Sequence, residues 1–151
     1  MIEWQLTRQV DRSAEHAFDV IGTNMFENHP RWEKEVVEIR PLTPGPVGVG
    51  SRAVMVRQEF GRRSETEYEI TEFEPGRRIA AFHPDAKMDF FIAFELDPID
   101  ADSCTIQVDV RAELQGWMRI LEPIMRRAMP KQAQRIADDM AEVIESTPVR
   151  A

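Results

Sequence analysis

Apolar and polar residues alternate along most of the middle of the chain. Within residues 88–96 every second residue is apolar: Met88, Phe90, Ile92, Phe94 and Leu96. Residues 104–114 repeat this pattern. Runs of the same kind occupy five further segments: residues 2–10, 35–41, 51–60, 64–73 and 78–83. A period of two is typical of strands that bury one face. The pattern therefore predicts a seven-stranded antiparallel sheet that is covered on one side only.

Helical periodicity is found in two other parts of the chain. Ser13 is a candidate N-cap of a short helix after the first strand, and a second helical turn is expected over residues 24–28. The C-terminal segment 116–146 has apolar residues at helical spacing. Because proline lacks an amide donor and crowds the preceding turn, we expect a kink near Pro123 and a break near Pro130. The order of elements predicts an α+β domain in which a curved sheet wraps around a long C-terminal helix.

Composition and charge narrow the classes of partner. A chain of 151 residues suits one core, so we expect a single domain over residues 1–147 and a short tail at 148–151. No segment approaches the roughly 20 apolar residues of a membrane span, and the polar N-terminus lacks an apolar signal core. We therefore expect a cytoplasmic protein without membrane insertion. The formal net charge of −8 argues against nucleic acid and against electrostatic docking on anionic membranes. Small molecules or proteins remain as partners, and the sequence leaves both a monomer and a homodimer open.

Four short segments carry a resemblance to a known family. They are NHPRW at residues 28–32, VVEIR at 36–40, GPVGVGSR at 45–52 and YEITEFEPGRR at 68–78. With them the whole chain resembles the START-like (SRPBCC) superfamily of helix-grip proteins, and within it the polyketide cyclase/dehydrase and lipid-transport-like group common in bacteria. These segments are turns and strand ends, so they specify a fold and no reaction. The resemblance implies an elongated cavity between the sheet and the long helix that accepts hydrophobic ligands.

The alternation and the resemblance together give a set of candidate ligand-binding residues. The residues expected to line the cavity are Tyr68, Met88, Phe90, Ile92, Val108, Val110, Trp117, Leu121 and Met125. Tyr68 is the only tyrosine and lies on the inward parity of its strand, where it would be either a pocket residue or ordinary core. His29 and His83 each precede a proline, and we expect them in loops where they could contact the polar end of a ligand.

Other chemistry is disfavoured by its sequence context. The Gly-rich loop at residues 45–50 leads into a strand, whereas a phosphate-binding loop must open into a helix. Cys104 lies on the dry face as a small buried hydrophobe. Glu65, Glu67 and Glu69 share the wet face of their strand, where solvated ion pairs are expected. We find no set of metal ligands and expect neither a metal nor a cofactor.

The sequence therefore favours a protein that binds a hydrophobic small molecule such as a lipid, a polyketide or an aromatic compound. Two alternatives stay open. One is an enzyme of the cyclase or dehydratase type, although no buried acid–base pair can be identified from the sequence. The other is a protein-interaction module without a ligand, for which Trp32 is the candidate exposed apolar residue.

Overall fold

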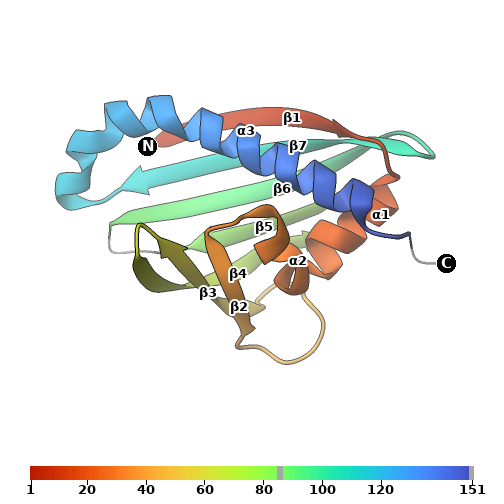
Figure 1. Cartoon of the computed structure of the whole chain (residues 1–151), viewed down its shortest axis with the longest axis horizontal. Coiled ribbons are helices and arrows are strands. Elements are labelled where there is room, and N and C mark those ends of the chain that lie inside the picture. Colours follow the sequence, from red (N-terminus) through yellow and green to blue (C-terminus); the bar gives the residue numbers. More distant parts are fainter. Residues whose placement is uncertain (85–86, 150–151) are drawn as a thin grey trace.

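A single antiparallel sheet forms the framework of the computed structural model, which describes residues 1–84 and 87–149 (Figure 1). Its strands are β1 (Ile2–Val10), β2 (Val36–Pro41), β3 (Arg52–Glu59), β4 (Arg62–Glu74), β5 (Arg78–His83), β6 (Met88–Asp100) and β7 (Ser103–Leu114). Their spatial order is β1-β7-β6-β5-β4-β3-β2. The strands from β2 to β7 form a meander, and β1 pairs with β7 as the edge strand at the far end from β2. The predicted seven-stranded α+β fold is confirmed.

Three short helical segments follow β1: α1 (Ala14–Phe18), the π-helical turn η1 (Asp19–Thr23) and α2 (Met25–Trp32). The predicted cap is present, since the Ser13 hydroxyl accepts a hydrogen bond from the His16 amide at 3.1 Å. The second helix is longer than the predicted turn and includes both His29 and Pro30. Pro30 cannot donate a backbone hydrogen bond within α2. Burial of Met25, His29 and Trp32 on one face of the helix compensates for this loss.

The C-terminal segment begins as the 3-10 helix η2 (Gly116–Leu121) and continues as α3 (Glu122–Ser146). Pro123 stands in the first turn of α3, where a missing amide costs nothing, so the expected kink is instead the change from one helix type to the other. The expected break at Pro130 is wrong, since α3 runs through it without interruption. Met129 and Ala133 on either side of Pro130 are buried, and their packing holds the helix together there.

The core lies between the sheet and the helices, and it is filled unevenly. It is solid beneath the C-terminal half of α3, where Val10, Ile106, Met140 and Ile144 are fully buried. Toward the start of α3 the strand side chains Met88, Phe90 and Ile92 and the helix side chain Met125 are only half-buried. The fold therefore leaves its unfilled space at one end.

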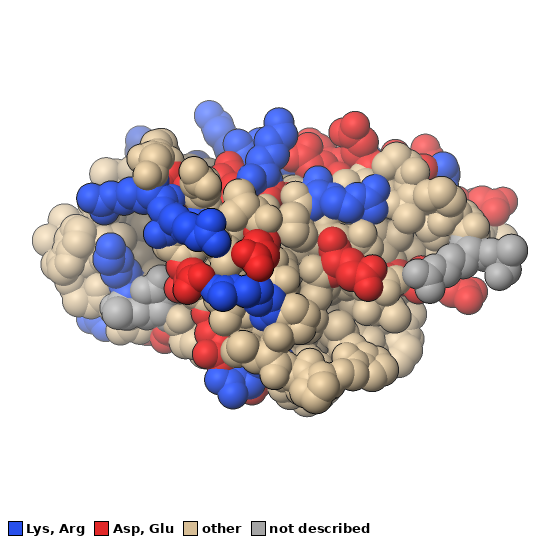
Figure 2. All heavy atoms as spheres, turned by 60° about the horizontal axis from the view of Figure 1, so that its bottom comes forward, with Lys and Arg blue, Asp and Glu red and all other residues tan. Residues whose placement is uncertain are grey.

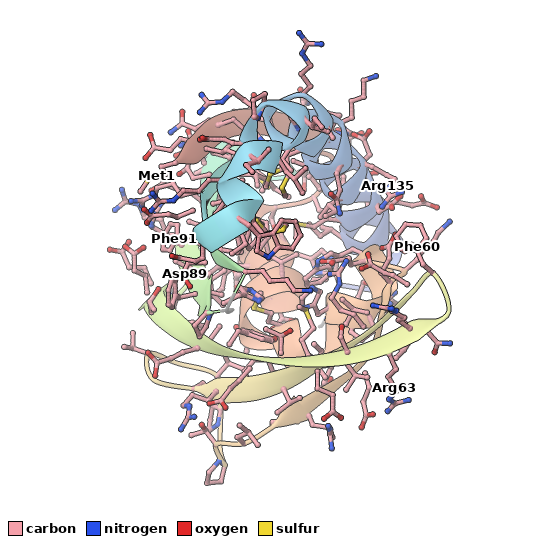
Figure 3. All side chains as sticks on the ribbon, turned by 90° about the vertical axis from the view of Figure 1, so that its left-hand side faces the viewer. Met1, Phe60, Arg63, Asp89, Phe91 and Arg135 are labelled. Carbon is pink, nitrogen blue, oxygen red and sulfur yellow. The ribbon has the colours of Figure 1, made fainter. Side chains whose placement is uncertain are left out.

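The surface at this less filled end differs from the rest of the molecule. Lys and Arg gather toward the end where η2 lies, and Asp and Glu dominate the other end (Figure 2). Figure 3 looks onto the η2 end, where the sheet curves beneath α3 and Phe60 lies on the β3–β4 hairpin across from η2. None of the helices within the described residues is long and apolar enough to cross a membrane.

Gly22 in η1 is required by a close contact within the core. A Cβ at this position would lie 2.6 Å from the Phe18 ring, which is buried and packs edge-on against Phe73 with 5.4 Å between ring centroids. We expect Gly22→Ala to lower the free energy of unfolding by about 1–3 kcal/mol, because the ring must shift within a packed core. Gly48→Ala is the matched control, since a Cβ there meets nothing within 4 Å. Urea unfolding of both variants checks this, and equal stabilities would mean that Phe18 has room to move.

Candidate functional site

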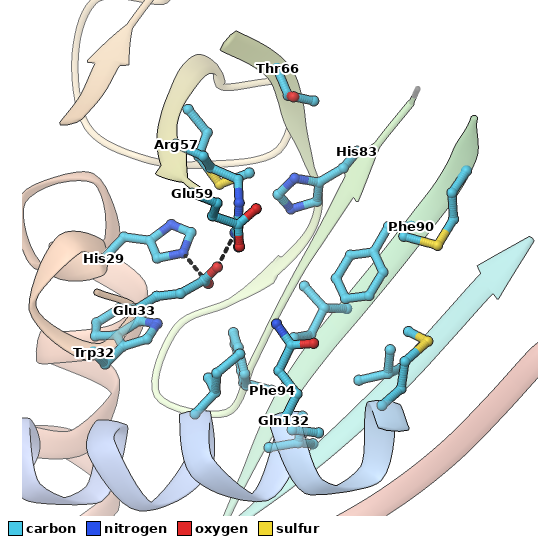
Figure 4. A pocket seen from close by; sticks show the side chains of 18 of the residues that line it. His29, Trp32, Glu33, Arg57, Glu59, Thr66, His83, Phe90, Phe94 and Gln132 are labelled. Atoms are coloured by element: carbon cyan, nitrogen blue, oxygen red, sulfur yellow. Dashed lines mark hydrogen bonds and ion pairs between the residues drawn. The ribbon is translucent and has the colours of Figure 1, made fainter. Parts of the chain in front are cut away.

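A cavity of about 450 Å³ occupies the space between the sheet and the first half of α3 (Figure 4). One wall is apolar and comes from β1, β6, β7 and α3, with the lining residues Trp4, Met88, Phe90, Ile92, Phe94, Val108, Val110, Met125, Met129, Ala133 and Ile136. The other side is more polar and comes mainly from α2, β3, β4 and β5, with His29, Glu33, Arg57, Glu59, Ser64, Thr66 and His83 beside the apolar Met25, Trp32 and Met55. Gln132 of α3 also lines the cavity. Such a division suits a ligand with an apolar body and a polar end.

Most of the residues that the sequence proposed for a cavity lie on these walls. The structure brings together Met88, Phe90, Ile92, Val108, Val110 and Met125 on the apolar side and His29 and His83 on the polar side. Both histidines lie in regular elements rather than in the expected loops, because α2 extends to Trp32 and β5 ends at His83.

Three of the proposed lining residues lie elsewhere. Tyr68 is fully buried but stands behind His83, with the two rings stacked at 4.7 Å and 14°. Trp117 is 68% exposed on the outside of η2, and Leu121 is half-buried outside the lining. The segment has two apolar stripes, one residue apart, and the structure turns the stripe of Met118, Met125 and Met129 toward the core. The expectation that Trp117, Ile120 and Ile124 face the sheet is therefore wrong.

A charged cluster forms the centre of the polar wall. The Nε2 atom of His29 lies 3.0 Å from Oε1 of Glu33, four residues later in the chain. Arg57 of β3 pairs with the other oxygen of Glu33 and also donates to Glu59 at 2.8 Å. Burial alone would raise the pKa of Glu33, but His29 and Arg57 outweigh burial and lower it from 4.5 to about 2. Glu33 is thus held as a buried carboxylate that orients both of its partners.

A row of aromatic rings fixes the position of this cluster. Trp32 stacks on His29 at 5.4 Å, His29 meets Tyr68 edge-on at 6.2 Å, and His83 meets Phe90 edge-on at 5.7 Å. With the stack of Tyr68 on His83, the row connects α2 to β6 across the cavity wall. Trp32 is only 2% exposed, so the expectation that it could form an exposed interaction patch is wrong.

Buried polar atoms without a partner remain beside the cavity. Within the part of the chain that the structure describes, they are Trp4 Nε1, His29 Nδ1 and the Tyr68 hydroxyl. A buried polar group without a hydrogen bond costs about 1–3 kcal/mol, so each such atom calls for a partner. Trp4 and His29 are among the residues that line the cavity, whereas Tyr68 is not.

Glu33 and Arg57 were missed by the sequence reasoning, although each carried a signal. Glu33 follows His29 by four residues, the spacing of facing side chains on a helix, but His29 had been assigned to a loop. Arg57 has the same parity as the buried Ala53 and Met55 on β3, and a charged residue in an apolar parity indicates a polar site on the inner face.

The remaining candidates keep ordinary structural roles. Cys104 is buried. Glu65 is exposed and pairs with Arg40 at the surface. In residues 1–84 and 87–149 no three His, Cys, Asp or Glu side chains gather as metal ligands would.

His83 makes the stability of the fold depend on pH. Burial lowers the pKa of its imidazole from 6.5 to about 3, so the folded protein keeps His83 neutral where the unfolded chain would bind a proton. The free energy of unfolding is therefore unaffected by the titration of His83 above about pH 6.5. It falls as the pH is lowered from 6.5 toward 3, because protonation of His83 then stabilises the unfolded chain. We expect His83→Phe, which keeps a ring beside Tyr68 but cannot titrate, to flatten the decline. Urea midpoints of both proteins across this range would measure it, and identical slopes would show that His83 is hydrated in the fold.

The sheet, the long helix and the cavity between them define a helix-grip domain. The chain belongs to the polyketide cyclase/dehydrase and lipid transport family, whose model matches residues 1–145. No curated protein sequence matches it.

Solved structures share the fold at low sequence identity. A START superfamily protein from Mycobacterium smegmatis is 18% identical with a TM-score of 0.75, and the match covers 95% of this chain and 97% of that one. Norcoclaurine synthase from Thalictrum flavum, solved with dopamine and hydroxybenzaldehyde, is 13% identical with a TM-score of 0.72, covering 98% and 88%. The di-domain ARO/CYC BexL of the BE-7585A biosynthetic pathway is 15% identical with a TM-score of 0.79, covering 96% of this chain and 47% of that one. At these identities the likeness concerns the fold alone.

Proposed function

We propose that the protein binds one amphiphilic small molecule, with a lipid, polyketide or aromatic body, in the cavity between the sheet and α3. The observation that carries this proposal is the pairing of an apolar wall with a partly buried charged cluster in one space of about 450 Å³. Transfer of the apolar body out of water would drive binding, and the polar wall would fix its orientation.

The unpartnered atoms narrow the chemistry of the ligand. The indole Nε1 of Trp4 can only donate a hydrogen bond, so it favours a carbonyl or another acceptor oxygen. When Nε2 of a neutral His29 donates to Glu33, Nδ1 is an acceptor and favours a hydroxyl group. A hydroxylated ketone or phenol with an apolar remainder meets both demands. The family description, which joins polyketide chemistry with lipid transport, supports the same class.

A cavity-filling variant tests the proposal. Val110→Phe adds volume at the apolar wall and should weaken binding of the fluorescent probe anilinonaphthalene sulfonate at least about tenfold. Val20→Phe is the control: Val20 is 1% exposed, lies outside the lining, and should lose about 1–3 kcal/mol from overpacking. If Val110→Phe binds the probe as the wild type does, the cavity is not the binding site.

An enzyme of the dehydratase or cyclase type is the second candidate function, and the His29–Glu33 pair favours it. A general base needs a partner that orients it, and Glu33 holds one ring nitrogen of His29 while the other, Nδ1, has no hydrogen-bond partner among the described residues. In a dehydration, Nδ1 would take the proton from the carbon beside a ketone and then pass it to the β-hydroxyl. That group leaves as water with the electron pair of its C–O bond, and a double bond conjugated with the ketone forms. Absorbance of the enone product from a β-hydroxy ketone measures this. His29→Gln should abolish turnover and keep probe binding, and equal turnover by both proteins would exclude the role.

A further inference from the structure

The outer side of η2 and of the first turns of α3 carries an apolar stripe with no partner in the fold. Trp117, Ile120 and Ile124 are 68%, 78% and 66% exposed. Their spacing of three and four residues puts them on one side of the helical segment, next to the stripe of Met118, Met125 and Met129 that packs against the core. Single exposed apolar residues are common, but three large ones in a row are typical of an interaction surface.

Basic residues continue and flank this stripe. Arg127 and Lys131 follow Ile124 at the same helical spacing, and both are exposed. Arg119 and Arg126 also belong to the segment, and its only acidic residue, Glu122, pairs with Arg126 and with the N-terminal amine. In a chain with a net charge of −8, this end is locally basic, in agreement with Figure 2. The net charge of the whole chain therefore does not exclude an anionic partner at this end of the protein.

We propose that η2 and the first turns of α3 dock on the surface of an anionic lipid bilayer. Trp117, Ile120 and Ile124 would enter the boundary between headgroups and acyl chains, where tryptophan is favoured, while the basic residues meet lipid phosphates. Charge complementarity selects a membrane over a second copy of this chain. In a two-fold dimer through this stripe, the basic residues of both copies would face each other and repel. The acidic remainder of the molecule would point away from the bilayer.

The docking surface is next to the cavity. Met125 and Met129 of the same helix line the cavity from its inner side. Across from η2, Phe60 is fully exposed at the tip of the β3–β4 hairpin with a φ of 50°, a conformation that is uncommon for a residue other than glycine (Figure 3). Arg62 and Arg63 follow it in the chain and are also exposed. The η2 segment and the tip of the β3–β4 hairpin thus both carry exposed apolar and basic residues at the same end of the protein.

Vesicle binding by the full chain tests the docking surface. The protein should sediment with vesicles of phosphatidylcholine containing about 30% phosphatidylglycerol, and much less with phosphatidylcholine alone. Raising the salt from about 50 mM to about 500 mM should release it. Tryptophan fluorescence gives a second readout, because Trp32 is buried and Trp4 lies in the cavity wall whereas Trp117 is exposed. A blue shift on binding would report the entry of Trp117 into the interface.

Charge substitutions within the stripe separate docking from other roles. Ile120→Asp and Ile124→Asp should each weaken vesicle binding about tenfold or more and leave folding and cavity probe binding unchanged. Val49→Asp is the matched control, since Val49 is 69% exposed in the β2–β3 loop. The inference is overturned if neither kind of vesicle binds, if Val49→Asp has the same effect, or if Trp117 becomes buried by concentration-dependent dimerisation instead. It does not depend on the proposed function, because cavity binding is measured without vesicles.

Discussion

Met140→Ala should lower the free energy of unfolding by about 2–5 kcal/mol, the loss typical of a large side chain removed from a packed core. Met140 of α3 is 0% exposed and belongs to the solid end of the molecule. Met125→Ala removes the same atoms from the same helix, but Met125 borders the cavity and its packing is already incomplete. We expect this second loss to stay near about 1 kcal/mol.

Urea midpoints of the two methionine variants measure the difference. Equal losses would mean that Met125 is locked in a solid core and that the space beside it is filled. A small loss for Met125→Ala together with a changed affinity for anilinonaphthalene sulfonate would agree with a cavity wall.

Glu33→Ala should destabilise the protein by about 3–5 kcal/mol, since breaking a buried ion pair leaves the partner charge without compensation. Arg57 is 18% exposed at its side chain and Glu33 is 12% exposed, so water cannot replace the lost partner well. Glu59 still binds Arg57, which favours the lower end of the range. Glu65→Ala is the control, because its pair with Arg40 is about half exposed and should contribute less than about 1 kcal/mol.

The effect of Glu33 also has a defined pH dependence. The lowered pKa means that its stabilisation is complete above about pH 4.5 and is lost as the pH falls toward 2. The stabilities of the wild type and Glu33→Ala should therefore differ most above pH 4.5 and converge below it. A difference that is independent of pH would show that Glu33 acts through packing rather than through its charge.

The strand framework could be predicted from the sequence because one face of the sheet is dry and the other is wet, so alternation marks nearly every strand. The C-terminal segment was harder, for a physical reason. Trp117, Ile120 and Ile124 form one apolar stripe and Met118, Leu121 and Met125 another, and helical spacing alone cannot tell which one faces the sheet. The continuity of α3 through Pro130 was likewise decided by tertiary packing, which overrides a local preference.

The polar residues of the cavity could not be predicted from the alternation of apolar and polar positions. Glu33 and Arg57 come together because Val36, three residues after Glu33, pairs with Arg57 in the β2–β3 ladder. That register depends on which strands pair, and alternation alone does not give it. His29 and His83 stand out in the sequence as titratable groups before proline, a context that predicts loops, whereas the structure places them in α2 and β5. The apolar wall was easier to anticipate, because inward parity on β6 and β7 points toward the space under α3 whether or not that space is filled.

Native mass spectrometry of the protein purified from its own host tests the central claim most directly. The polypeptide has a mass of 17.5 kDa. We expect a single adduct of a few hundred daltons, a size that suits a cavity of about 450 Å³, and we expect Val110→Phe to lose it. A bare polypeptide mass for the wild type, or an adduct that persists in Val110→Phe, would contradict the assignment of the cavity as a ligand site.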